Sequence, residues 1–338
     1  MLRVRAAIAA LPRLSPKHGF TAPSEDAFYL AAGRAHTLHG ALADGVGSMR
    51  RHGLDPGAFP RALLRHSLAP LQRSAATLAS STPAAALAAG WAGVQQEGAQ
   101  GACTACYFRL HLSRRSGGGG GGGGGAALEA LNLGDCSLLV FRGGALLAAA
   151  RQAHRGGAFD TPHQLGQLAG AASARHFEAP ADAQPLACAL QSGDTLLVCS
   201  DGLTDNLFPA EIAAHVAGGG GAAALALRLV ADAHAKAQDG RRDGPFALAA
   251  KDADILWGAG GRLDDVTAMV LVLEASGDAP EAGGEAPLLD PREAQEVLSP
   301  CADAPRHLLP QNLALEPPGA GQAARRRKQA APAAPQQQ

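Results

Sequence analysis

Residues 37–47 read TLHGALADGVG, and this stretch points to a fold built on β-hairpins. Thr37–Ala43 predicts a strand that ends in Asp44-Gly45, and Phe28–Ala31 predicts the strand before it. Further short strands are predicted at Thr104–Leu112, Leu128–Leu133, Ser137–Arg142, Thr195–Cys199 and Thr267–Leu273. Because most of these strands follow one another in hairpins, and not in strand-helix-strand units, we expect antiparallel sheets with helices outside them and disfavour a Rossmann-type fold.

Four segments between the strands predict helices. They are Pro60–Leu71, Pro83–Gln95, Pro209–Val216 and Ala222–Ala237. The second of them follows Thr82, a residue type that caps helix N-termini, and has Pro83 at its first helical position. Helices and hairpins together predict an α+β fold.

The composition excludes several classes of function. The 338 residues carry 29 Lys+Arg and 30 Asp+Glu, so no net basic charge indicates a nucleic-acid or membrane-surface partner. No apolar run reaches the roughly 20 residues that cross a bilayer. Six cysteines are too few for a disulfide-stapled scaffold of this length, and Cys103 and Cys106 are better explained as small residues of a half-buried strand than as a zinc or redox site.

Two segments lack the side chains that a packed core needs. Residues 117–125 are nine consecutive glycines between two strand candidates, which predicts an expanded hairpin loop. Residues 276–338 are rich in Ala, Pro, Gly and Gln, and we expect this tail to be disordered. Residues 1–275 then form one domain that carries the glycine-rich insertion.

The first 17 residues allow two interpretations. Met1–Lys17 contains Arg3, Arg5, Arg13 and no acidic residue, which is typical of an organelle transit peptide. The same segment also fits the first strand of the domain. The first interpretation predicts a mitochondrial or chloroplast location, and the second predicts a cytoplasmic one.

Acidic residues stand at the ends of the predicted strands, mostly beside glycine. They are Glu25, Asp26, Asp44, Asp135, Asp201, Asp264 and Asp265. A single Asp-Gly pair is typical of a turn, but five such sites in a chain with 17% charged residues weaken that explanation. Carboxylates brought together repel one another unless a cation neutralises them, and oxygen ligands favour Mg²⁺ or Mn²⁺.

Six motifs in this order resemble the metal-dependent protein phosphatase 2C family. They are Glu25-Asp26-Ala27, Ala43-Asp44-Gly45-Val46-Gly47, Gly101-Ala102-Cys103-Thr104-Ala105, Asn132-Leu133-Gly134-Asp135, Cys199-Ser200-Asp201-Gly202-Leu203-Thr204-Asp205-Asn206 and Asp264-Asp265-Val266-Thr267. Gly53-Leu54-Asp55-Pro56, residues 159–165 and Pro245-Phe246-Ala247 are similar to its small branch of T-cell-activation protein phosphatase homologues. The resemblance covers residues 2–273 and implies a four-layer α-β-β-α sandwich of two antiparallel sheets flanked by helices.

The resemblance also implies roles for the acidic residues. Asp44 would bridge two Mn²⁺ or Mg²⁺ ions, with the Gly45 carbonyl on one ion and Asp201 and Asp264 on the other. Glu25 and Asp26 would hold metal-bound water. Asp135 and Asp205, together with Asp201, match positions of a third metal in relatives. Asp265 receives no role.

The implied reaction is hydrolysis of phosphoserine or phosphothreonine in proteins by a hydroxide bound between the two metals. Two positions depart from the family pattern. Val46 stands where many relatives place a His that acts as general acid, and Thr21 stands where many place an Arg that grips the phosphate. Lys17 or His18 would have to replace that Arg. The basic run Arg50-Arg51-His52 is better explained as an exposed loop than as a contact to an anionic substrate.

We therefore predict an active, metal-dependent protein serine/threonine phosphatase, acting as a monomer on phosphoprotein substrates. The first alternative is a catalytically weak or inactive protein of the same fold that binds or regulates a partner. The second is an enzyme that acts on a small phosphorylated metabolite.

Overall fold

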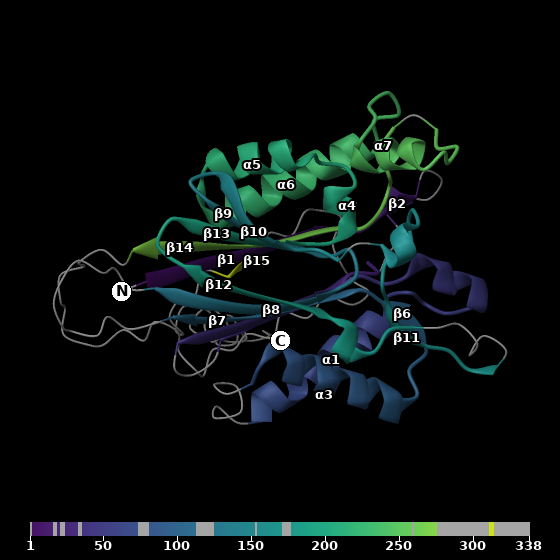
Figure 1. Ribbon diagram of the computed structural model, residues 1–338, viewed down its shortest axis with the longest axis horizontal. Helices are drawn as coiled ribbons and strands as arrows, with labels where there is room; N and C mark the ends of the chain where they lie inside the picture. Colours follow the sequence, from purple (N-terminus) through teal and green to yellow (C-terminus); the bar gives the residue numbers. More distant parts are fainter. Residues whose placement is uncertain are drawn as a thin grey trace, which may run out of the picture.

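Two antiparallel sheets stack face to face at the centre of the computed structural model (Figure 1). The structure describes residues 2–15, 19–20, 24–32, 36–73, 81–112, 125–152, 154–170, 177–258, 260–275 and 311–313. The first sheet has the order β10-β9-β13-β14-β1-β15, and the second has the order β12-β8-β7-β5-β4. All strand pairs within the two sheets are antiparallel, which confirms the prediction from the hairpins.

The strands and helices have the following bounds. The first sheet contains β1 (Leu2–Leu11), β9 (Ser137–Arg142), β10 (Ala145–Ala150), β13 (Asp194–Cys199), β14 (Val266–Ala275) and β15 (Gln311–Leu313). The second contains β4 (Ala27–Ala32), β5 (Thr37–Ala43), β7 (Ala105–Leu112), β8 (Ala126–Leu133) and β12 (Gln184–Leu190). Two short strand pairs, β2 (Leu14–Ser15) with β3 (Gly19–Phe20) and β6 (Gly101–Cys103) with β11 (Leu165–Gln167), lie outside these sheets. The helices are α1 (Ala58–Arg73), α3 (Pro83–Glu97), α4 (Asp201–Thr204), α5 (Pro209–Ala217), α6 (Gly221–Ala237) and α7 (Pro245–Asp252), with the 3₁₀ turns η1 (Gly47–His52), η2 (Arg155–Gly157) and η4 (Pro180–Asp182).

Helices cover the outer face of each sheet, so the molecule has four layers (Figure 1). α1 and α3 pack on the second sheet, where Phe59 and Leu87 join one buried cluster with Tyr107. α5 and α6 pack on the first sheet, where Leu229 lies in a buried cluster with Val270. The structure therefore confirms the α+β, four-layer α-β-β-α architecture.

The strands read as continuous apolar runs because both of their faces are buried. On β13, Leu196 and Val198 point into the cluster between the sheets, whereas Leu197 and Cys199 point into the cluster beneath α6. The exposed fraction of each of these four side chains is 0%. Burial of one such Leu or Val contributes about 1.5–3 kcal/mol to stability, so the three-cluster core holds the strand ends in place.

Most predicted elements appear within a few residues of their predicted bounds. The Thr82 side chain caps α3 by accepting a hydrogen bond from the Ala85 N–H (3.1 Å). The predicted hairpin around the glycine run is present, because Leu112 of β7 pairs with Ala126 of β8, while residues 117–124 lie outside the described ranges. Cys103 and Cys106 pack as small residues in the buried clusters, and both are fully buried where a half-buried strand was predicted.

Several elements were not predicted: β10, β12 and α7, and the short strands β2, β3, β6 and β11. Leu2–Leu11 forms β1, which pairs along its whole length with β14, as the interpretation of this segment as the first strand predicts. Gln311–Leu313 pairs with β1 on its other side, so this part of the tail is a strand and not disordered. The rest of the tail, residues 276–310 and 314–338, lies outside the described residues.

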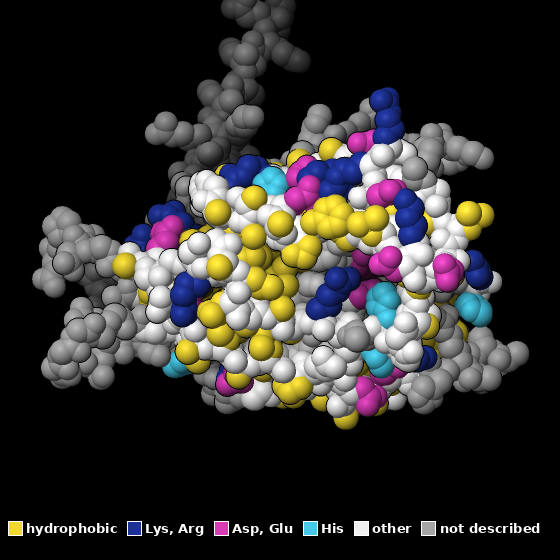
Figure 2. Space-filling model, turned by 45° about the horizontal axis from the view of Figure 1, so that its top comes forward, with side chains coloured by type: hydrophobic (Ala, Val, Ile, Leu, Met, Phe, Trp, Pro, Cys, Tyr) yellow, Lys and Arg dark blue, Asp and Glu magenta, His cyan; other side chains and the backbone are white. Residues whose placement is uncertain are grey.

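One side of the sandwich leaves apolar side chains open to solvent. The edge strands β10 and β12 carry mostly exposed or part-exposed residues, and Leu146 and Leu147 of β10 are 51% and 45% exposed. Figure 2 shows a face on which a broad hydrophobic area lies next to acidic, basic and His side chains. Among the described residues, no helix has the length and apolar character that crossing a bilayer requires.

Candidate functional site

The predicted acidic residues come from different strands of both sheets. Asp26 precedes β4 and Asp44 follows β5 in the second sheet, whereas Asp201 follows β13 and Asp264 precedes β14 in the first. The charges of Asp201, Asp26, Asp264 and Asp135 all act on the Asp44 carboxyl and, together with burial as the largest cause, raise its pKa well above the usual range. The fold therefore brings these side chains together, as the sequence predicts.

Two of the glycines in the Asp-Gly pairs are required by close backbone approach. A Cβ on Gly45 would overlap the carbonyl oxygen of Pro56 and lie 2.9 Å from that of Glu25. A Cβ on Gly202 would overlap the carbonyl oxygen of Asp265. These Asp-Gly pairs are thus not free surface turns, because each packs its backbone against a segment that carries other acidic residues.

Asp26 is fully buried and links the two sheets. Its Oδ2 accepts hydrogen bonds from the hydroxyls of Ser200 (2.9 Å) and Thr267 (2.6 Å), which lie at the ends of β13 and β14. Its Oδ1 is buried and has no hydrogen-bond partner. Burial first, and then the charge of Asp265, raise the pKa of Asp26 well above its usual value.

Asp265, which received no role from the sequence, holds the segment that carries Glu25. Its Oδ2 accepts a hydrogen bond from the Glu25 N–H (2.6 Å), and its Oδ1 accepts one from the Arg13 N–H. Glu25 is buried, with 6% of the residue exposed, and its carboxylate pairs with Arg50. Burial raises the pKa of Glu25, and the hydrogen bond from Arg50 opposes that shift.

Arg262 is a cation that pairs with several of the clustered acidic residues, and sequence reasoning missed it. Its Nη1 lies 2.7 Å from Asp205 Oδ2 and 3.2 Å from Asp201 Oδ2, and its Nη2 lies 3.4 Å from Asp264 Oδ2. A further contact joins Nη1 to Asp160 (3.3 Å). The signal was available, because Arg262 is the sole basic residue between Lys251 and the end of β14.

The remaining predicted residues stand as follows. Asp135 is 4% exposed, and its Oδ2 lies 3.7 Å from His154 Nε2. Burial and the charge of Asp201 raise the pKa of Asp264 to about 7. Lys17 and His18 lie outside the described residues. Arg50 on η1 is a second functional candidate, since its side chain is 49% exposed while one end of its guanidinium is anchored on Glu25.

The site fits a divalent cation in its donor chemistry. Its acidic side chains offer carboxylate oxygens, the ligand atoms that Mg²⁺ and Mn²⁺ prefer. Asp201 Oδ1 and Asp26 Oδ1 are both buried without a hydrogen-bond partner. Burial first, and then the charges of neighbouring carboxylates, raise the pKa of Asp26 and Asp44, whereas at Asp201 the charge of Arg262 opposes the rise that burial causes. As the side chains stand, no three His, Cys, Asp or Glu groups in the described ranges are spaced to hold a metal ion, so the donors are present but are arranged around Arg262.

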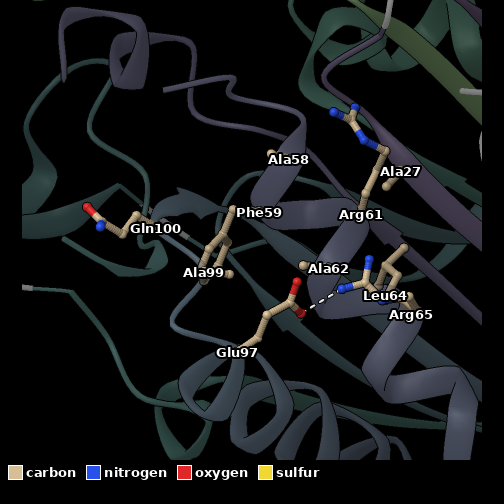
Figure 3. A pocket seen from close by; sticks show the side chains of 10 residues that line it. All are labelled: Ala27, Ala58, Phe59, Arg61, Ala62, Leu64, Arg65, Glu97, Ala99 and Gln100. Carbon is tan, nitrogen blue, oxygen red and sulfur yellow. Dashed lines mark hydrogen bonds and ion pairs between the residues drawn. The ribbon is translucent and has the colours of Figure 1, made fainter. Parts of the chain in front are cut away.

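A separate cavity of about 380 Å³ lies between α1 and α3. Phe59, Ala62 and Leu64 form apolar parts of its lining, and Arg65 at its edge pairs with Glu97 (2.6 Å; Figure 3). None of the clustered acidic residues lines this cavity. It is therefore not the candidate active site.

Known proteins similar to this chain include two phosphatases. The chain is 32% identical over 257 residues to probable protein phosphatase 2C 55 of Arabidopsis thaliana, which covers 75% of this chain and 48% of the relative. It is 30% identical over 265 residues to the protein phosphatase PTC7 homolog fig of Drosophila grimshawi, which covers 75% of this chain and 80% of that protein. The chain thus spans about half the length of the Arabidopsis relative. No protein-family model matches it.

Among solved structures, the X-ray structure of the photosystem II phosphatase PBCP has the same fold. The two align with a TM-score of 0.63 at 23% sequence identity, over 81% of this chain and all of that one. At this identity the similarity shows the fold alone, and it agrees with the four layers described above.

Proposed function

Since the chain belongs to the protein phosphatase 2C family of enzymes, we propose that it hydrolyses phosphoserine and phosphothreonine in proteins with the help of two Mn²⁺ or Mg²⁺ ions. The observation that carries the proposal is the Oδ1 of Asp201, which is buried without a hydrogen-bond partner near the Asp44 carboxyl, whose pKa is raised by burial and then by the neighbouring carboxylates. A carboxylate cluster of this kind costs stability unless a cation joins it, and a reaction that needs cations explains why the fold holds it.

In this proposal Asp44, the Gly45 carbonyl, Asp201 and Asp264 would hold the two ions. When bound, the ions would lower the pKa of a water molecule and neutralise the phosphate charge. Asp26 and Glu25 would accept hydrogen bonds from water at the site. Asp26 is suited to this because Ser200 and Thr267 fix one of its oxygens and leave the other without a partner.

The substrate phosphate needs a cationic contact that the sequence left open. Arg50 supplies one, because Glu25 orients part of its guanidinium while about half of the side chain is exposed. A planar guanidinium matches two phosphate oxygens at once, which orients the phosphoryl group and offsets its charge. Lys17 and His18 stay predictions for the same role.

Mn²⁺-dependent turnover of a phosphothreonine peptide by the purified protein tests the proposal. We expect Asp44→Asn to lose at least about tenfold in kcat/KM, because it removes a charge partner of both ions. Asp252→Asn, at the exposed end of α7, is the matched control and should keep full activity. A loss of less than tenfold in Asp44→Asn would reject the ligand assignment.

A second candidate function is binding without catalysis, and Arg262 favours it. Its guanidinium already supplies positive charge to Asp201, Asp205 and Asp264, so the fold has a cation of its own. In that case calorimetry at millimolar Mn²⁺ would detect no binding, and the peptide would be bound but not hydrolysed.

A further inference from the structure

Arg262 lies where the sequence predicts a third metal ion. The residues matched to that ion are Asp135, Asp201 and Asp205, and the guanidinium of Arg262 contacts two of them. Building on the proposed two-metal function, we propose that Arg262 is a built-in cation that replaces the third metal. The site would then bind two divalent ions, and removal of Arg262 would create a place for one more.

The two carboxylate oxygens of Asp201 have different surroundings. Oδ2 lies 3.2 Å from Arg262 Nη1, whereas Oδ1 is buried and has no partner. One oxygen thus faces the guanidinium, and the other is available to a metal of the catalytic pair. Asp205 makes the shortest of these contacts, with its Oδ2 lying 2.7 Å from Arg262 Nη1.

The guanidinium is held too firmly to be a loose surface charge. Its Cζ lies 4.6 Å from the centre of the Phe246 ring, and this ring is itself packed against Phe159 and Trp257, with centroid distances of 4.9 and 4.8 Å. The Asn206 side chain fixes the Arg262 backbone by accepting from its N–H (3.0 Å) and donating to its carbonyl (2.8 Å). A metal ion at Asp205 would have to displace the Arg262 guanidinium, which stacks on Phe246 and whose backbone is fixed by Asn206.

The other side of the predicted third site also has a partner. The Oδ2 of Asp135 lies 3.7 Å from His154 Nε2, and that imidazole is part-buried. A guanidinium within hydrogen-bond distance of Asp205 repels a divalent ion there, since both are positive. Arg262 therefore supplies fixed charge at this position without depending on the metal concentration.

The test counts Mn²⁺ ions per chain by equilibrium dialysis and metal analysis of the purified full-length protein. We expect two ions in the wild type and one more in Arg262→Gln. The extra ion should disappear in the double variant Arg262→Gln/Asp205→Asn and in Arg262→Lys, which keeps the positive charge. Arg242→Gln is the matched control, because Arg242 also stacks on a ring (Phe208, 5.2 Å) and pairs with a carboxylate (Glu211, 2.8 Å).

The outcomes separate this proposal from the two-metal function. Equal counts in the wild type and in folded Arg262→Gln overturn the role of Arg262, whatever the count is. The role of Arg262 is also overturned if the wild type binds three Mn²⁺ ions, or if Asp205→Asn alone removes an ion from it. These two results can be obtained even if Arg262→Gln fails to fold. A wild type without Mn²⁺ rejects the proposed function, while the difference between the two proteins still decides the role of Arg262.

Discussion

Stability of the metal-free protein should fall as the pH rises from 5 to 7. The pKa of Asp264 is about 7 in the folded protein against 3.8 as its ordinary value, and its side chain is 22% exposed. At a pH between these two pKa values, Asp264 holds a proton in the folded state that it has lost in the unfolded state. A group with a raised folded pKa therefore costs stability as it ionises, and that cost grows with pH until about pH 7.

The magnitude follows from the size of the shift. Each pH unit in this window removes about 1.4 kcal/mol per proton, so a shift of about three units amounts to roughly 4 kcal/mol by pH 7. This is a large part of the 5–15 kcal/mol that is typical of a folded domain. The raised pKa values of Asp26, Asp44 and Asp205, caused mainly by burial and then by neighbouring carboxylates, act in the same direction.

Urea denaturation in EDTA at pH 5, 6 and 7, followed by circular dichroism, measures this effect. Asp264→Asn should flatten the dependence by about 1.4 kcal/mol per pH unit, and Asp252→Asn should leave it unchanged. Saturating Mn²⁺ should reverse the trend, because its ligands bind metal in their deprotonated form. Wild-type stability that is equal at pH 5 and pH 7 without metal, or an Asp264→Asn curve parallel to the wild type, would refute the reasoning.

Three further substitutions test separate parts of the structure. Gly202→Ala should lower the free energy of unfolding by about 1–3 kcal/mol in urea denaturation, because the new Cβ overlaps the Asp265 carbonyl. Tyr107→Phe should cost about 1 kcal/mol in the same assay, since it removes the buried 2.7 Å hydrogen bond to Ser67. Arg50→Gln should raise KM for a phosphopeptide about tenfold or more and weaken product inhibition by inorganic phosphate, if its guanidinium contacts the phosphate.

Each of these has a control in the chain. Gly218→Ala should be mild, because the nearest atom to its Cβ would lie 3.4 Å away. Ser67→Ala with Tyr107→Phe closes a double-mutant cycle, and additive effects there would contradict the hydrogen bond. Arg51→Gln changes the neighbouring, exposed arginine, and an equal rise in KM for both arginine variants would show a general charge effect and not a contact.

The sheets were predictable wherever strands form local hairpins. The pair at β4 and β5 is one example, because a short loop joins two apolar runs and the pairing needs no distant partner. β10 was missed because its sequence, ALLAAA, lacks β-branched and aromatic residues and lies mostly exposed at a sheet edge. The first strand stayed ambiguous because its partner, β14, is at the other end of the domain. The predicted mitochondrial or chloroplast location stays a prediction.

The acidic cluster was predictable from residue type and position, but its supporting contacts were not. Asp44 and Asp201 can be identified from the sequence because each follows an apolar strand and precedes a glycine. Asp265 acts through the backbone N–H groups of Glu25 and Arg13, and no sequence pattern marks such a contact. Arg262 is one basic residue after two glycines, and its role depends on four carboxylates from three parts of the chain.

The pairing of β1 with β14 has a consequence for how the protein is made. Leu2 lies opposite Ala275, so β1 must wait for β14, a strand that is synthesised much later, before the two can pair along their length. The apolar side chains of β1 and of its neighbours stay uncovered during that interval, when chaperones and unwanted partners compete for them. A ribosome-bound chain that ends before Asp264 should therefore remain protease-sensitive in β1, even though the other residues of the acidic cluster have already been synthesised.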